Sequence, residues 1–142
     1  MYKGNKDPFD IIQDQLNKAM ETTYSAKTLE YSNNPVNMGR MNDPTASAWI
    51  NGLCGDFMEI YLVIKDNKIT DIKFYTDGCG ITLACGSVVT LLAKNKNIND
   101  VLSISPNNII EHLERLPVEN IHCAILAANT LHKAIADYLL KY

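Results

Sequence analysis

MEIYLVIKDNKITDIKFYT, residues Met58–Thr76, is the stretch that decides the fold. Its first part, Met58–Ile64, is almost continuously apolar and aromatic, and Ile69–Thr76 resumes that character after the polar run Lys65–Lys68. Two such runs on either side of a short polar turn predict a β-hairpin. The preceding stretch Ala46–Leu53 has a similar but weaker pattern, which suits a third antiparallel strand.

Several other segments repeat apolar residues at helical spacing, which predicts helices around this sheet. The first begins at Asp7-Pro8, and a second runs through Tyr24–Tyr31 and ends at Asn33-Asn34-Pro35. A third has one apolar face made of Ile81, Ala84, Val88, Leu91 and Leu92. A short fourth helix lies between Ser105-Pro106 and Pro117 and carries Ile109, Ile110, Leu113 and Leu116, and the C-terminal helix runs from Ile121 to Leu139. The sequence therefore predicts an α+β fold, with a small three-stranded antiparallel sheet covered by helices, a long C-terminal helix and an extra N-terminal helix.

Length and composition limit the classes of protein to consider. The chain has 142 residues, of which 46% are hydrophobic and 20% charged, as in an ordinary globular protein with one main domain. The net charge of -3 and the absence of a Lys/Arg cluster argue against nucleic acid as a partner. No apolar run approaches the length of a membrane span, and the N-terminus lacks an apolar core, so we expect a cytoplasmic protein that does not enter the membrane.

Three of the four cysteines lie at predicted boundaries between elements, where reactive groups are usually held. Cys54 is followed by Gly55 and Asp56 before a strand, Cys79 stands between two glycines after a strand, and the His122-Cys123 pair begins a helix. Residues two apart in an extended stretch project to the same side, so the Cys54 thiolate and the Asp56 carboxylate can share one metal. Soft thiolates with one harder ligand suit an iron-sulfur cluster or zinc.

The same residues have simpler readings. A lone cysteine is most often a small buried apolar side chain, and the chain has no Cys-x-x-Cys pair. Asp56 can cap a turn, and His122 can be a surface histidine. Two other functions therefore stay open: a domain that zinc stabilises for binding, and a thiol enzyme with Cys123 or Cys54 as nucleophile and His122 as base. Adjacent residues of a helix diverge by about 100°, which disfavours the enzyme.

Five motifs follow one another in an order and spacing that match a known family. They are Tyr24-Ser25, Asn34-Pro-Val-Asn-Met-Gly39, Cys54-Gly-Asp-Phe-Met58, Asp77-Gly-Cys-Gly80, and Leu116-Pro117 through His122-Cys-Ala-Ile-Leu-Ala127. On these motifs the chain resembles the IscU/NifU-type iron-sulfur cluster assembly scaffolds. The resemblance covers residues 24–142, which leaves residues 1–23 as an N-terminal helical extension.

The resemblance implies a role and a set of ligands. The three cluster cysteines of the family fall on Cys54, Cys79 and Cys123, its carboxylate on Asp56, and its histidine on His122. It further implies that a cysteine desulfurase delivers persulfide sulfur, that a labile 2Fe-2S cluster forms, and that this cluster passes to apo iron-sulfur acceptor proteins. A ferredoxin and a second copy of the chain are further candidate partners. Such a protein is a scaffold and carrier rather than an enzyme, and zinc fits the same ligands in purified protein.

The chain departs from the family pattern in two places. Better-known members have a Leu-Pro-Pro-Val-Lys run that a dedicated Hsp70-type chaperone reads, whereas residues 116–120 read Leu-Pro-Val-Glu-Asn here, which puts that partnership in doubt. Cys85 stands where serine is familiar. Six helical residues correspond to about 600°, so Cys85 should point about 240° around the helix from Cys79 and be buried rather than share a ligand site.

Overall fold

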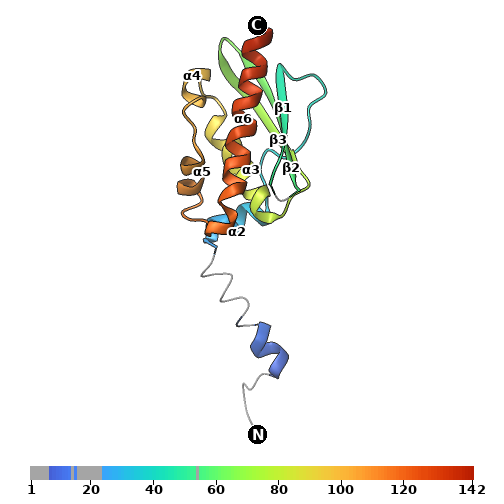
Figure 1. The fold of residues 1–142 in the computed structure, drawn as a ribbon, viewed down its shortest axis with the longest axis vertical. Helices are drawn as coiled ribbons and strands as arrows, with labels where there is room; N and C mark the ends of the chain where they lie inside the picture. The colour runs from blue at the N-terminus through green and yellow to red at the C-terminus, as the bar shows by residue number, and fades with distance from the viewer. Residues whose placement is uncertain (1–6, 14, 16–23, 54) are drawn as a thin grey trace.

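Three antiparallel strands form one sheet whose spatial order follows the chain (Figure 1). The computed structural model describes residues 7–13, 15, 24–53 and 55–142. The strands are β1 (Ala46–Asn51), β2 (Phe57–Lys65) and β3 (Lys68–Thr76). This confirms the predicted sheet, although β1 ends two residues earlier than predicted, where Gly52 enters a turn and donates its N–H to the carbonyl of Asp56 at 2.6 Å.

The β2–β3 hairpin closes through the two residues Asp66 and Asn67. Both have positive φ, 54° and 59°, as a type I′ turn requires, and its twist matches that of the paired strands. Side chains along β2 then alternate between the core and the outer face, with Met58, Ile60 and Leu62 fully buried. The local sequence thus sets both the turn and the register of the hairpin.

Helices cover one face of the sheet and leave the other uncovered (Figure 1). They are α2 (Ala26–Asn33), α3 (Gly80–Ala93), α4 (Ile98–Val101), α5 (Pro106–His112), the 3-10 turn Val118–Asn120 and α6 (Ile121–Lys141). The long α6 packs on β1 and β2, and α3 packs on β3. Helix α2 packs against α3, and α5 packs against both α3 and α6. None of the helices in the described part of the chain combines the length and apolar character that crossing a membrane requires.

Two helical predictions differ from the structure. The predicted helix after Ser105 should have extended to Leu116, but α5 ends at His112 because Glu114 adopts a φ of 76°. The short α4 was not predicted, since only the side chain of Asn97, which accepts a hydrogen bond from the Asn99 N–H, marks its start. Leu91, predicted on the buried face of α3, is 38% exposed.

The predicted N-terminal helix is described only over residues 8–13 and 15, which are helical. Asp7 caps this segment, because its Oδ1 accepts the N–H of Asp10 at 2.9 Å. The side chains of Phe9, Ile11 and Ile12 are exposed. The rest of the predicted helix, including residues 16–23, lies outside the described residues, so the proposed extension 1–23 stays a prediction.

The Asn34–Gly39 motif holds the loop before β1 against the rest of the domain. The carbonyl of Asn37 accepts the Phe74 N–H at 3.0 Å, and the Gly39 N–H donates to the Phe74 carbonyl at 2.8 Å. The Val36 N–H donates to the Ser87 hydroxyl on α3. The motif therefore joins β3 to α3 beside the end of the sheet.

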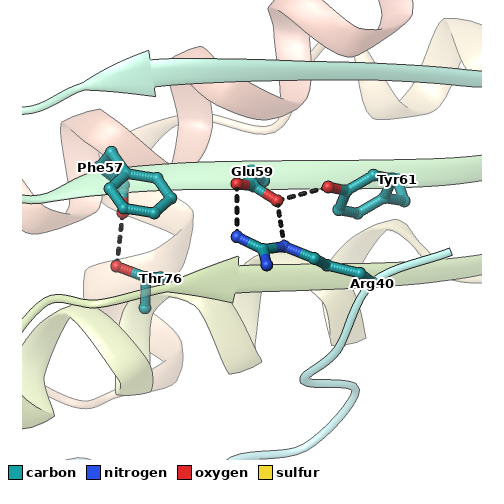
Figure 2. Close-up of polar contacts among 5 residues, drawn as sticks. All are labelled: Arg40, Phe57, Glu59, Tyr61 and Thr76. Carbon is teal, nitrogen blue, oxygen red and sulfur yellow. Dashed lines mark hydrogen bonds and ion pairs between the residues drawn. The ribbon is translucent and has the colours of Figure 1, made fainter.

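An ion pair fastens the same loop to the outer face of the sheet (Figure 2). The Arg40 guanidinium donates twice to the Glu59 carboxylate, at 2.9 and 3.0 Å, and lies 3.9 Å from the centre of the Tyr75 ring. The Tyr61 hydroxyl donates to the same carboxylate. The hydrogen bonds from Arg40 lower the pKa of Glu59 despite its partial burial. Paired, forked contacts of this kind hold a loop in one position.

Side chains of α6 cover the free edge of β1. The Asp137 carboxylate accepts the Ser47 N–H at 3.2 Å, and the Lys133 ammonium donates to the Trp49 carbonyl at 3.2 Å. Both backbone groups belong to the edge strand, so the helix provides the partners that a fourth strand would otherwise supply.

Where α3 packs on β3, the Phe74 ring lies directly on Gly86. A Cβ atom built on Gly86 would meet ring carbons at 2.3 Å, far inside van der Waals contact. Phe74 is fully buried, so the ring has no room to move. Gly86 therefore sets how near α3 comes to the sheet.

This contact predicts that Gly86→Ala destabilises the protein, although the helix propensity of alanine is about 1 kcal/mol more favourable than that of glycine. Overpacking of a filled core should outweigh that gain and lower the free energy of unfolding by about 1–3 kcal/mol. Urea unfolding of the metal-free protein measures it. Gly86→Ala combined with Phe74→Leu should recover part of the loss, because the smaller side chain leaves room for the added methyl. A more stable single variant would contradict the assignment.

Candidate metal centre

The loops that carry Asp56 and Cys79 are tied together by Thr76, the last residue of β3. Its hydroxyl donates to the Phe57 carbonyl at 2.5 Å (Figure 2) and accepts the Gly78 N–H at 3.0 Å. Because Phe57 follows Asp56 and Gly78 precedes Cys79, one buried hydroxyl fixes both predicted ligand loops at the same end of the sheet.

Gly52 and Gly55 shape the turn that presents Asp56. A Cβ on Gly52 would lie 2.5 Å from Asp56 Oδ1, so only glycine leaves space for the carboxylate there. Gly55 has a φ of 85°, which an L side chain rarely adopts. Cys54, the predicted ligand in this turn, lies outside the described residues.

The starts of α3 and α6 carry the two predicted cysteine ligands that the structure describes. Cys79 is the N-cap residue of α3 and is exposed, whereas Cys123 lies in the first turn of α6 and is buried. The entry to α6 is held by Tyr24, whose hydroxyl donates to Asn120 Oδ1 at 3.1 Å. Both cysteines thus lie at helix starts; this was predicted for Cys123, whereas Cys79 was predicted only to follow a strand.

Thr82 lies between three of the predicted ligands. Its hydroxyl donates to Asp56 Oδ2 at 3.0 Å, and the same Oγ lies 3.7 Å from Cys79 Sγ and 3.6 Å from Cys123 Sγ. The Thr82 side chain is fully buried. The structure therefore brings Asp56, Cys79 and Cys123 together around a hydroxyl that was not among the predicted site residues.

His122 is the fourth predicted ligand that the structure describes. Its Nε2 lies 3.6 Å from Cys123 Sγ. The expectation that adjacent helical side chains point too far apart to meet is wrong here, because the ring reaches back to the sulfur. His122 also lines the same pocket as Asp56 and Cys79.

An open pocket of about 430 Å³ gives access to this group. Its walls are formed by residues of the ligand loops and of the two helix starts: Gly55, Asp56, Asp77, Gly78, Cys79, Thr82, Asn120 and His122. A ligand can therefore reach the carboxylate, the imidazole and one thiol from solvent.

The two thiols of α3 differ in how readily they ionise. Partial burial of Cys79 opposes ionisation, but the N–H groups of Thr82 and Ile81 and the Thr82 hydroxyl outweigh it and lower the pKa of this thiol. Burial raises the pKa of Cys85 well above its usual value, and the charges of Cys123 and Cys79 raise it further. Cys85 is fully buried, as predicted, and is a poor ligand.

The side chains that the structure describes do not by themselves form a complete metal site. Within residues 7–13, 15, 24–53 and 55–142, no three His, Cys, Asp or Glu side chains make a group that could hold a metal ion. Two thiols, a carboxylate and an imidazole are nevertheless the donor types that iron and zinc prefer. Asp56 Oδ1 is buried without a partner among the described residues.

Sequence reasoning missed Thr82, although its spacing from Cys79 was visible. Residues three apart share one face of a helix, so Thr82 had to lie beside Cys79 once α3 was predicted to start there. Its contacts with Asp56 and Cys123 depend on how distant elements pack, and no local pattern indicates them.

Known proteins match the chain over most of its length. The family described as the NifU-like N terminal domain matches residues 23–142. The iron-sulfur cluster assembly scaffold protein IscU 1 of Archaeoglobus fulgidus is 42% identical over 119 residues, covering 83% of this chain and 78% of that protein. The scaffold protein IscU of Escherichia coli K12 is 38% identical over 123 residues, 83% of this chain and 95% of its own length. The solved NifU-like protein of Brucella abortus has a TM-score of 0.68 at 19% identity, covering 87% of this chain and 99% of its own, which shows a shared fold.

The different environments of the Cys79 and Cys85 thiols predict that Cys79 is alkylated at lower pH than Cys85. Thiolate is the reactive form, so a lowered pKa moves the rise of the alkylation rate to lower pH. We expect Cys79 in the metal-free protein to react with iodoacetamide at lower pH than N-acetylcysteine does, and Cys85 to stay unmodified until the protein unfolds. Mass spectrometry of peptides from a pH series measures this, and a Cys79 midpoint above that of N-acetylcysteine would contradict it.

Proposed function

The chain belongs to the NifU-like N-terminal domain family, and from this we propose that it is an iron-sulfur cluster assembly scaffold that builds a labile 2Fe-2S cluster and passes it on. Its relatives are named scaffold proteins, which agrees with a carrier rather than an enzyme. The proposed ligands are Cys54, Cys79 and Cys123, with Asp56 or His122 completing the site.

The observation that carries the proposal is the convergence of Asp56, Cys79 and Cys123 on one point. These residues come from the loop before β2, the start of α3 and the first turn of α6, so no helix or strand needs them together for its own stability. Donors that converge at the end of a rigid framework are the usual arrangement of a ligand site.

The openness of the site favours a cargo over a structural metal. Structural zinc sites are closed, with four protein ligands and no access from solvent. Here Cys79 is exposed, and the pocket beside it is open to solvent. Zinc fits the same donors, so purified protein can carry it, but we do not assign zinc the role of stabilising the fold.

Different residues of the proposed site would hold the cluster and allow its release. Thiolates bind iron tightly, whereas a carboxylate is a harder ligand that water displaces more easily. Cys79, with its lowered pKa, is ready to bind iron or to accept sulfur. A cysteine desulfurase would supply persulfide sulfur, a ferredoxin would serve as a further partner, and apo iron-sulfur proteins would accept the cluster. Thiol ligands stay reduced in the cytoplasm, where we place this activity.

Two regions of the chain bear on partners other than the desulfurase, the ferredoxin and the acceptor proteins. Residues 116–120 lack the second proline and the lysine of the chaperone-binding run, so no dedicated Hsp70-type chaperone is proposed. We assign residues 1–23 to a helical extension that packs on the domain or on a second copy of the chain, which leaves a homodimer open.

Anaerobic reconstitution with iron and sulfide tests the ligand set. We expect an oxygen-sensitive 2Fe-2S protein with visible charge-transfer absorption, because three thiolates and one harder ligand complete tetrahedral iron. Serine at Cys54, Cys79 or Cys123 should abolish stable assembly. Cys85→Ser is the matched control and should retain iron, since Cys85 is fully buried with a raised pKa. Equal loss of iron in all four variants would reject this ligand set.

The role of Asp56 predicts how fast the cluster leaves. Asp56→Ala should still assemble a cluster, with His122 or another ligand in the fourth position, but donate it more slowly because the easily displaced ligand is gone. The rate of transfer to an apo-ferredoxin, followed by circular dichroism under argon, measures this.

Asp77→Ala is the matched control for Asp56→Ala. Asp77 lines the same pocket, so its removal changes the local charge equally. Slow transfer in both variants would indicate an effect of charge alone, and wild-type transfer in Asp56→Ala would make Asp56 a turn residue.

A further inference from the structure

Thr82 occupies the point on which three of the proposed ligands converge. Its Oγ is 3.0 Å from Asp56 Oδ2 and 3.6–3.7 Å from the sulfurs of Cys123 and Cys79. A tetrahedral metal binds carboxylate oxygen at about 2.0–2.2 Å and thiolate sulfur at about 2.3 Å. For a metal at that point the carboxylate oxygen is thus about 0.8–1.0 Å too far away and the sulfurs about 1.3–1.4 Å, whereas all three lie at ordinary distances from a hydroxyl. The ligands are arranged around the Thr82 hydroxyl.

The hydroxyl and a bound metal compete for the same donors. A hydroxyl has one proton to donate, and the Asp56 carboxylate is the strongest of its three acceptors. When Asp56 Oδ2 ligates iron it loses this charge-assisted hydrogen bond, and thiolates that close around iron have to move away from Thr82 Oγ. The hydrogen bond therefore stabilises the cluster-free state only.

One bond rotation can move the hydroxyl out of the site. Threonine in a helix uses two rotamers, because its Oγ can also bond the carbonyl three or four residues earlier, which for Thr82 includes that of Cys79. Gly78 leaves this side chain space, since a Cβ there would lie 2.9 Å from both Thr82 Oγ and Cβ. Rotation of χ1 thus exchanges a bond to Asp56 for a bond to the helix.

We propose that Thr82 is a placeholder residue: its hydroxyl holds Asp56, Cys79 and Cys123 together in the cluster-free protein, rotates away when metal binds, and returns to favour release. This role rests on the proposed function, because it assumes that these residues are the ligands. Thr82 is a positioning residue that acts through Asp56 and the two thiolates. It limits how tightly the site holds its cargo, in contrast to an ordinary supporting residue, which would strengthen binding.

Binding of Co²⁺ alone to the metal-free full-length protein tests the placeholder role. Thiolate-to-cobalt charge-transfer absorption reports ligation by cysteine, and a chelator chase gives the release rate. Thr82→Ala should bind Co²⁺ about tenfold more tightly, since tenfold corresponds to about 1.4 kcal/mol, near the lower end of the net value of a hydrogen bond to a charged group. Thr82→Ser keeps the hydroxyl, so its dissociation constant for Co²⁺ should stay within about twofold of the wild-type value.

Two further variants control for packing. Thr130→Ala removes another fully buried threonine whose hydroxyl donates within its own helix, to the Leu126 carbonyl, and should leave Co²⁺ affinity unchanged. Thr82→Val keeps the volume of the side chain without its hydroxyl, so it remains informative if Thr82→Ala folds poorly. It should release Co²⁺ more slowly than wild type.

The outcomes separate the two hypotheses. If wild type gives no thiolate-to-cobalt charge transfer, the ligand set fails, and the placeholder role fails with it. If wild type gives this absorption but the alanine and valine variants bind no more tightly and release no more slowly, only the placeholder role is overturned. Tighter binding in Thr82→Ala that Thr82→Ser abolishes would establish the hydroxyl as the cause.

Discussion

The contact between the Phe74 ring and Gly86 governs the geometry of the whole domain. Because glycine lets α3 lie directly on this ring, the helix runs close along β3, and its first turn reaches the end of the sheet. Cys79 and Thr82 belong to that turn. With α6 packed on the neighbouring strands, the beginning of a second helix, with Cys123, meets the first at the same end. Core packing thus decides where the sulfur atoms at the starts of these two helices come together.

Hydrogen bonds from single hydroxyl groups then connect the ligand loops to this framework. Thr76 joins the loop of Asp56 to that of Cys79, Tyr24 holds the entry to α6 through Asn120, and Thr82 contacts the donors themselves. Each of these bonds is short in range and weak compared with the apolar core. The domain can therefore keep its shape while distances within the site change, which a carrier that fills and empties requires.

Sequence reasoning succeeded where structure is decided locally. The apolar runs of the hairpin, the polar turn between them and the apolar periodicity of α6 are each contained in one segment, and the two strands and the long helix appear as predicted. It failed where one backbone angle or a distant partner decides. Glu114 ends α5 by adopting positive φ, and Thr82 gains its place only when α6 and the Asp56 loop pack beside α3. His122 reaches Cys123 through side-chain rotation, which the directions of Cα–Cβ bonds do not reveal.

The cover that α6 gives to the edge of β1 has a consequence for solubility. An open edge strand recruits strands from other molecules and starts aggregation, and here Lys133 and Asp137 occupy the backbone groups that such a strand would use. The Ser47 N–H and the neighbouring Lys141 lower the pKa of Asp137, so the carboxylate stays ionised and keeps accepting this bond as the pH falls below the usual range of aspartate. The domain can thus expose the Cys79 thiol at one end of the sheet without offering the edge of β1 for polymerisation.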